Sequence, residues 1–229
     1  MSSALPRKSM LAPIFSGSSL LITFFLIPTI PVSAAPTPAA SKSQYEAALT
    51  TLNQLPVKGR APKTGYSREK FSHWRDPDRN GCDARNDILK RDLTMVVFKS
   101  GTDNCKVVAG KLLDPFSNKE IIFDLSQSAS NIDIDHVVAL SNAWQTGAFG
   151  LTTLQRTNFA NDPLNLIAVD FRLNRQKGDG DAATWLPPYK SYRCTYVTRQ
   201  VSVKAKYKLW VTPPEKAAIG KLLEGCLKD

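Results

Sequence analysis

The stretch Ile132-Asp133-Ile134-Asp135-His136-Val137-Val138 places two acids and a histidine among β-branched residues. Because β-branched residues favour extended structure, we predict a short strand here. On a regularly alternating strand, Asp133 and Asp135 would point to one face and His136 to the other. If the strand breaks at Asp135, the carboxylate and the imidazole can both reach one pocket. An isolated Asp-His pair is more often a surface ion pair than a reactive site, so the surrounding residues decide its meaning.

The chain that follows predicts a second strand and a helix. Residues 164–169 form another short apolar stretch, and residues 171–177 have helical composition. Asn165 lies 29 residues after His136, and Asn174 lies nine residues further on. We therefore predict an α+β fold built around a strand–strand–helix unit, with additional helices on either side.

The side chains of this unit suit the chemistry of phosphodiester hydrolysis. A neutral imidazole such as His136 can take a proton from water near physiological pH. The negative charge that develops can be stabilised by a divalent cation bound through hard oxygen ligands. Asp135 offers a carboxylate and Asn174 an amide oxygen, which predicts Mg²⁺ or Mn²⁺. Three cations of the predicted helix are expected to contact substrate phosphates: Arg172, Arg175 and Lys177.

The composition of the chain is basic. Thirty lysines and arginines against 20 acids give a formal net charge of +10, with an isoelectric point of about 9.5. A basic surface attracts polyanions, although charge by itself favours such a partner only slightly. We expect a nucleic acid substrate, with DNA as the first candidate and RNA as the second.

Taken together, these motifs resemble the HNH (His-Asn-His/Asn, ββα-metal) endonucleases of the GmrSD-type C-terminal domain group. The resemblance runs from about Tyr66 to Cys226. Its most specific pieces are Gly81-Cys82-Asp83-Ala84-Arg85-Asn86-Asp87, Asp133-Ile134-Asp135-His136-Val137-Val138-Ala139-Leu140, Ala143-Trp144, Phe159-Ala160-Asn161-Asp162-Pro163, Asn165-Leu166, Asn174-Arg175-Gln176-Lys177-Gly178-Asp179 and Trp185-Leu186-Pro187-Pro188. The resemblance implies an HNH-type nuclease domain over residues 42–229, with the ββα-metal motif at about residues 132–179.

The resemblance also implies roles for individual residues. His136 would be the general base, and Asp135 and Asn174 would bind the metal, with Asn174 standing where many HNH proteins carry histidine. Asn165 would hold the loop and the orientation of His136. Asp133 either supports His136 or a metal-bound water, or caps the turn. One departure is Ala139, where a common HNH pattern has proline after the histidine; it affects backbone stiffness more than chemistry.

The N-terminal segment reads as a secretory signal. Two basic residues precede an apolar stretch that is too short for a confident bilayer span, and small residues favour cleavage after Ala34. We therefore expect a signal peptide over residues 1–34, followed by a Pro/Ala linker over residues 35–41. The mature protein would be extracellular, with no stable membrane association after signal cleavage. A helix is expected next, with Ser43 and Glu46 at capping-box spacing.

Four cysteines lie in the expected mature chain: Cys82, Cys105, Cys194 and Cys226. An even number of cysteines behind a signal peptide favours two disulfides over a metal site, because no close Cys-x-x-Cys pair is present. Three pairings are possible, and we favour the sequence-local pairs Cys82–Cys105 and Cys194–Cys226.

Two other classes of protein remain compatible with these patterns. One is a non-catalytic secreted protein that binds polyanions through its basic surface, and the other is a phosphoesterase that acts on small substrates. The second histidine, His73, is expected to be structural rather than reactive.

Overall fold

A computed structural model describes Met1, residues 40–127 and residues 131–228. The chain divides into a unit of residues 1–32 and a unit of residues 33–229. Residues 2–34 of the predicted signal peptide and the first five linker residues lie outside the described residues. Among the residues that are described, no helix combines the length and the apolar character needed to cross a bilayer.

The described domain contains helices and two antiparallel sheets, as the predicted α+β class requires. In chain order the elements are α1 (Lys42–Gln54), the 3₁₀ helix η1 (Arg68–Phe71), α2 (Ala84–Asp92), β1 (Thr94–Phe98), β2 (Val107–Leu113), β3 (Glu120–Asp124), β4 (Ile132–His136), α3 (Leu140–Gln145), η2 (Ala148–Gly150), α4 (Thr153–Asn161), β5 (Leu166–Asp170), α5 (Phe171–Lys177), η3 (Lys190–Tyr192), α6 (Arg193–Lys206) and α7 (Pro213–Lys228).

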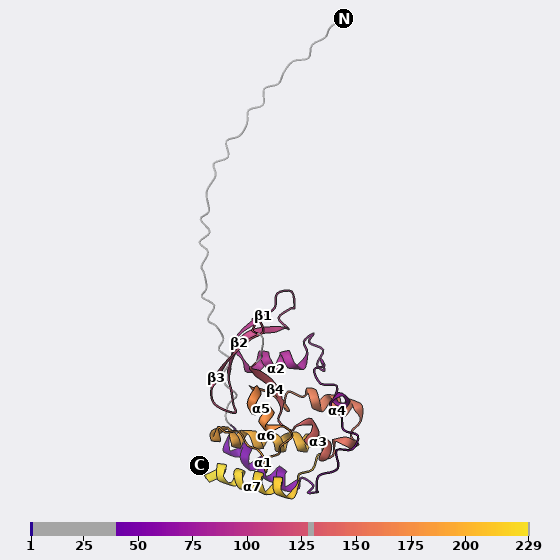
Figure 1. Ribbon diagram of the computed structural model, residues 1–229, viewed down its shortest axis with the longest axis vertical. Helices are drawn as coiled ribbons and strands as arrows, with labels where there is room; N and C mark the ends of the chain where they lie inside the picture. Colours follow the sequence, from indigo (N-terminus) through magenta and orange to yellow (C-terminus); the bar gives the residue numbers. More distant parts are fainter. Residues whose placement is uncertain (2–39, 128–130, 229) are drawn as a thin grey trace. The chain divides into compact units, whose positions relative to one another are not determined.

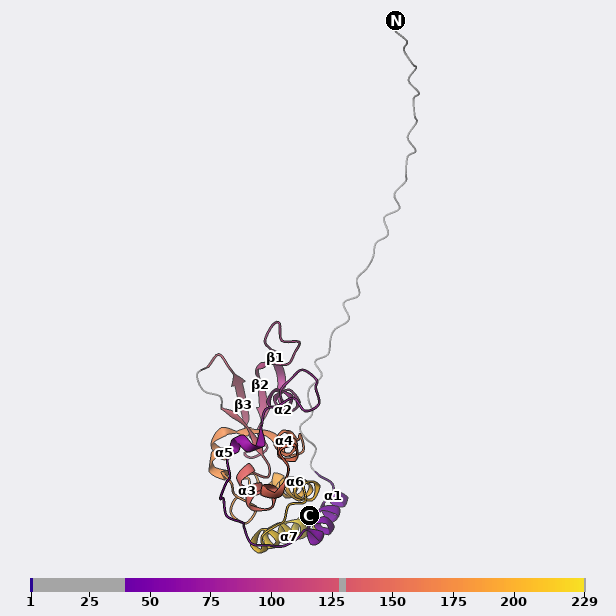
Figure 2. The same cartoon turned by 90° about the vertical axis from the view of Figure 1, so that its right-hand side faces the viewer.

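These elements are arranged around the central strands. The sheet β1–β2–β3 and α2 lie at one end of the described domain, and α1, α6 and α7 lie at the other (Figure 1). Strand β4 and helix α5 lie between them (Figure 1), and the view turned by 90° again places α5 between the two ends (Figure 2). The unit that carries the predicted reactive residues is therefore at the centre of the domain.

The centre is a two-stranded ribbon in which β4 pairs with β5, from Ile132 opposite Asp170 to His136 opposite Leu166. Alternate residues of the ribbon enter two different cores. One face contributes Ile132, Ile134, Leu166 and Ala168 to a core shared with α2, and the other contributes Ile167 and Val169 to a core shared with α1, α6 and α7. Because both faces are covered, four of the five residues of β5 are buried, and Asp170 is the exception.

Helix α7 begins with a capping box. The Glu215 amide donates to the Thr212 hydroxyl, and the Thr212 amide donates to the Glu215 carboxylate. Glu215 is also paired with the buried Lys204 of α6, at 2.7 Å. At the first helix the expected cap was wrong. Ser41, rather than Ser43, caps α1, because Ser41 and Gln44 bond each other reciprocally.

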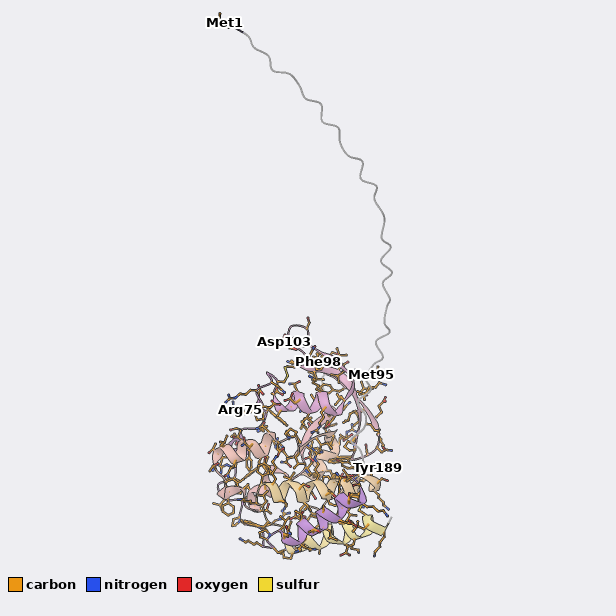
Figure 3. All side chains as sticks on the ribbon, turned by 180° about the vertical axis from the view of Figure 1, so that it is seen from behind. Met1, Arg75, Met95, Phe98, Asp103 and Tyr189 are labelled. Carbon is orange, nitrogen blue, oxygen red and sulfur yellow. A yellow bond between two sulfur atoms is a disulfide. The ribbon has the colours of Figure 1, made fainter. Side chains whose placement is uncertain are left out.

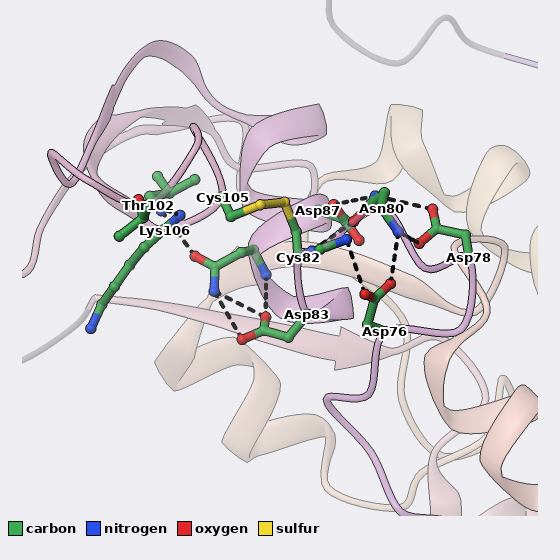
Figure 4. Close-up of a disulfide and its surroundings, with 12 residues drawn as sticks. Asp76, Asp78, Asn80, Cys82, Asp83, Asp87, Thr102, Cys105 and Lys106 are labelled. Carbon is green, nitrogen blue, oxygen red and sulfur yellow. Dashed lines mark hydrogen bonds between the residues drawn. A yellow bond between two sulfur atoms is a disulfide. The ribbon is translucent and has the colours of Figure 1, made fainter.

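Both predicted disulfides are confirmed, Cys82–Cys105 and Cys194–Cys226. The first joins the start of α2 to the β1–β2 loop, beside a turn in which three carboxylates surround one asparagine (Figure 4). In that turn the Asn80 side-chain amide donates to Asp78 and Asp87, and the Gly81 amide donates to Asp76. The second disulfide joins α6 to α7.

The outer face of the three-stranded sheet is partly apolar. Met95 of β1 is 74% exposed, and a view from behind shows it near the sheet end of the domain (Figure 3). The opposite face packs on α2 through residues such as Leu112 and Phe123. The sheet thus covers α2 and, through it, one face of the central ribbon.

Candidate functional site

The strand–strand–helix unit ends at a cavity of about 270 Å³. The cavity lies where β4 ends, beside the C-terminal part of α5 and the segment that leads into η1. It brings together the adjacent residues Asp135 and His136 with Asn174, which lies 39 positions after Asp135 in the sequence. The other lining residues are Tyr66, Arg68, Ile134, Ala139, Leu140, Ser141, Gly178 and Asp179.

His136 is a buried and neutral imidazole. Its side chain is 4% exposed, and its ring lies 5.9 Å from the ring of Trp74. Nε2 lies 2.9 Å from the carbonyl oxygen of Ala160. A carbonyl can only accept a hydrogen bond, so Nε2 carries the proton and Nδ1 carries the free lone pair. Burial lowers the pKa of His136 from 6.5 to about 3, which keeps the ring unprotonated at physiological pH.

Strand β4 alternates regularly through His136. Asp133 and Asp135 therefore share the face that α5 covers, and His136 belongs to the other face, as the first of the two alternatives predicts. Asp135 and His136 nevertheless line the same cavity, because the strand ends there.

Asp135 is held by a lysine of α5. The Lys177 ammonium donates to both carboxylate oxygens, at 2.6 and 2.8 Å, and to the carbonyl oxygen of His136 at 2.6 Å. The Lys177 side chain is 0% exposed. Burial raises the pKa of Asp135, and the neighbouring ammonium opposes that shift.

This geometry corrects one expectation. Lys177 was expected to contact substrate phosphate, but all three of its donor hydrogens are directed at Asp135 and at the backbone of β4. Helical residues three apart lie on one face, so Lys177 shares with Asn174 the face that meets β4 and does not reach the surface. The sequence pattern Asn-x-x-Lys therefore describes an inward face of α5.

Asp133 pairs with Asn174. The Asn174 side-chain nitrogen donates to Asp133 Oδ2 at 3.2 Å. Asp133 thus contacts Asn174, the predicted metal ligand, and not His136. The bond orients the amide and leaves the Asn174 oxygen available to the cavity, which Asn174 lines.

Asn165 holds the chain just after β4. Its Oδ1 accepts a hydrogen bond from the Val138 amide at 2.9 Å. Its Nδ2 donates to the carbonyl oxygens of Val138 and Phe159, at 3.4 and 3.3 Å. Asn165 is fully buried. These contacts hold the backbone two residues after His136 and the α4 residue next to Ala160, whose carbonyl oxygen is bound to the ring of His136.

The two arginines of α5 lie elsewhere. Arg172 and Arg175 stack against the ring of Phe171, at 5.5 and 5.2 Å from its centroid. Neither is among the residues that line the cavity. A role for them would be at the surface beside the site.

Arg68, Tyr66 and Ser141 also line the cavity, although no sequence motif pointed to them as site residues. Arg68 lies 68 positions before His136, in a polar segment without hydrophobic periodicity. No local pattern connects that segment to β4, so only the tertiary structure reveals the contact.

The donor set fits a hard divalent cation. Asp135 and Asn174 supply one carboxylate and one amide oxygen to the same cavity. Lys177 binds both oxygens of Asp135, but each oxygen keeps a further lone pair. Mg²⁺ is usually held through one or two carboxylates together with waters and substrate phosphates, so a sparse set suits it. Within residues 40–127 and 131–228, no group of three His, Cys, Asp or Glu side chains could hold a metal ion.

The fold and the cavity define a disulfide-bonded α+β protein with a neutral histidine and a carboxylate at the end of a two-stranded ribbon. The chain belongs to the family described as GmrSD restriction endonucleases, C-terminal domain, which matches residues 83–222. An uncharacterized secreted protein of Arthroderma benhamiae is 38% identical over 206 residues, covering 88% of this chain and 97% of the relative. No solved structure matches the chain.

These similarities establish a nuclease-related family. The secreted relative and the two disulfides agree with an extracellular location, because disulfides persist in oxidising compartments.

Proposed function

We propose that this protein is a secreted, metal-dependent endonuclease of the HNH class that hydrolyses phosphodiester bonds of DNA, with RNA as a second substrate to be tested. In this proposal β4, β5 and α5 are the ββα-metal core. The observation that carries it is the neutral His136, whose Nε2 is bound to Ala160 and whose Nδ1 is unprotonated, in a cavity shared with Asp135 and Asn174.

His136 acts as the general base. Its Nδ1 accepts the proton of a water molecule as that water attacks phosphorus, and the bond from Nε2 to Ala160 holds the ring and its tautomer. Asn165 holds the backbone at Val138, two residues after His136, and at Phe159, beside the carbonyl that binds the ring. Asp135 and Asn174 would hold Mg²⁺ or Mn²⁺, which when bound stabilises negative charge on the phosphate and the leaving oxygen. Lys177 and Asp133 orient these two ligands.

The test is nicking of supercoiled plasmid DNA by the purified protein, with Mg²⁺ or Mn²⁺ and with EDTA. His136→Ala is expected to lower the rate by at least about a hundredfold, as loss of a general base does. Arg79→Ala is the control, because Arg79 is exposed and does not line the cavity, whereas His73 accepts a hydrogen bond from the cavity residue Arg68. An equal rate for wild type and His136→Ala contradicts the assignment of the base.

A second candidate function is non-catalytic binding of polyanions. It is favoured by the net charge of +10 and by the ion pair between Lys177 and Asp135, in which the ammonium balances the charge of the carboxylate without a metal ion. This candidate predicts DNA binding without cleavage at any metal concentration. Cleavage of small phosphodiesters but not of plasmid would instead indicate a phosphoesterase.

We further propose that residues 1–34 are removed on secretion. N-terminal sequencing of the secreted protein tests this directly, since a first residue at Ala35 is expected. An N-terminus at residue 1 in the secreted protein contradicts it.

A further inference from the structure

We infer that Arg68 binds a phosphate of the substrate and is the cationic side chain through which the cavity holds this phosphate. This inference rests on the proposed function, since it names the group that receives the phosphodiester in the same site. It replaces Lys177, which the sequence pattern favoured and which the structure buries.

The charges that line the cavity leave an excess of positive charge. Three charged residues line it: Arg68, Asp135 and Asp179. Asp135 is paired with Lys177 at 2.6 Å, and Asp179 is paired with Lys63 at 2.6 Å. Both carboxylates are therefore neutralised. Across the described part of the chain Arg68 makes no ion pair, so its charge is the one left over, and the cavity favours an anion.

The backbone of Arg68 is anchored, while its side chain makes only the contact to His73 among the described residues. Helix η1 ends at Phe71, which is fully buried and packs against the rings of Trp144 and Phe159. Lys70, also in η1, donates to the carbonyl oxygen of Gly65 at 2.6 Å. Arg68 itself is exposed. A cation on a fixed backbone loses less freedom on binding than one on a mobile loop.

The guanidinium group of Arg68 keeps donors that can bind a phosphate. Arg68 Nε donates to His73 Nε2 at 3.5 Å, and no other hydrogen bond of the Arg68 side chain occurs among the described residues. Its two terminal nitrogens remain available. A planar guanidinium presents parallel N–H groups that match two oxygens of a phosphate, which a lysine ammonium cannot do.

Arg68 also lies in the right place, because Arg68 and His136 line the same cavity. A phosphate bound by Arg68 is therefore next to the base that activates water. Glu69 follows Arg68 in the chain, and the charge of Arg68 contributes to lowering the pKa of Glu69, but this carboxylate is solvent-exposed and forms no ion pair with Arg68 among the described residues.

The experiment compares Arg68→Gln, Arg68→Lys and Arg79→Gln in the full-length secreted protein. Arg79 is exposed and outside the cavity, so Arg79→Gln removes the same charge without touching the site. Binding of a fluorescent DNA duplex is measured by anisotropy in EDTA over a range of salt concentrations, and nicking is measured with Mg²⁺. Thermal melting checks that each variant is folded.

Arg68→Gln is expected to lower the nicking rate by about tenfold to a hundredfold, as for loss of charge-assisted hydrogen bonds. The slope of log binding constant against log salt should fall by about 0.9, the value for one phosphate contact. Arg68→Lys should restore the salt slope but only part of the rate, because it keeps the charge and loses the fork. Arg79→Gln should match wild type in both measurements.

The inference is overturned if Arg68→Gln and wild type share the same rate and salt slope, or if Arg79→Gln loses as much as Arg68→Gln. Failure of the proposed function is a separate result. If wild type cleaves nothing with any metal, the anisotropy measurement in EDTA still decides whether Arg68 contacts phosphate.

Discussion

The buried imidazole of His136 should make the protein sensitive to acid. In the unfolded chain this histidine takes up a proton near its ordinary pKa of 6.5, whereas in the folded chain it does so only at about 3. Between these values the unfolded state binds more protons, so stability rises with pH and is lost as pH falls below 6.5. The slope for one group is about 1.4 kcal/mol per pH unit. Acidification from about pH 7 to about pH 4.5 should therefore cost about 2.5 kcal/mol through this residue alone.

The assay is urea unfolding in EDTA at several pH values, followed by circular dichroism. Wild type is compared with His136→Gln, because a glutamine amide can replace Nε2 as the donor to Ala160 and does not titrate. Asp135 has a raised pKa and contributes with the opposite sign, but it is present in both proteins. The difference between the two stability curves thus isolates the imidazole.

The matched control is His73→Gln. Partial burial lowers the pKa of His73, but without the full burial of His136, so this variant should keep most of the acid slope. The reasoning is refuted if His136→Gln loses stability with acid as steeply as wild type. It is equally refuted if His73→Gln, rather than His136→Gln, flattens the curve.

Three further changes test the contacts around the site. Lys177→Met leaves the buried Asp135 carboxylate unpaired and should lower the free energy of unfolding by about 3 to 5 kcal/mol at neutral pH. Adding Asp135→Asn should recover part of this free energy, and no recovery would mean that the two residues are not coupled. Asn165→Ala removes three side-chain hydrogen bonds and should cost about 2 to 3 kcal/mol in urea unfolding, so a cost below about 0.5 kcal/mol would contradict its role in holding the backbone. Replacing Cys194 and Cys226 by serine opens a link across 32 residues and should cost about 3 to 4 kcal/mol, measured against unreduced wild type; an unchanged midpoint would show that the link is dispensable.

The central unit could be predicted from the sequence because its signals are local. Helix α5 begins and ends where the composition of residues 171–177 indicates, and β4 follows from the β-branched residues around Asp133. Both disulfides follow from the sequence-local pairing. In each case, residues near in sequence decide the outcome.

The partners of the polar side chains could not be predicted in the same way. Lys177 has the composition of a surface cation, and only the covering of β4 by α5 turns it inward to Asp135. Arg68 reaches the cavity because Phe71 anchors η1 in a distant core. Long-range packing determines both contacts, and no periodic pattern in the sequence indicates such packing.

The pairing of β4 with β5 has a consequence for how the site can fail. The two faces of this ribbon belong to different cores, so a shift of pairing by one residue would exchange the contents of both. Local fraying at the ribbon would therefore disturb packing throughout the domain. We expect the backbone amides of this ribbon to exchange with solvent only when the whole domain unfolds. The reactive centre should therefore be lost together with the fold, and neither heating nor proteolysis should disrupt it in an otherwise folded domain.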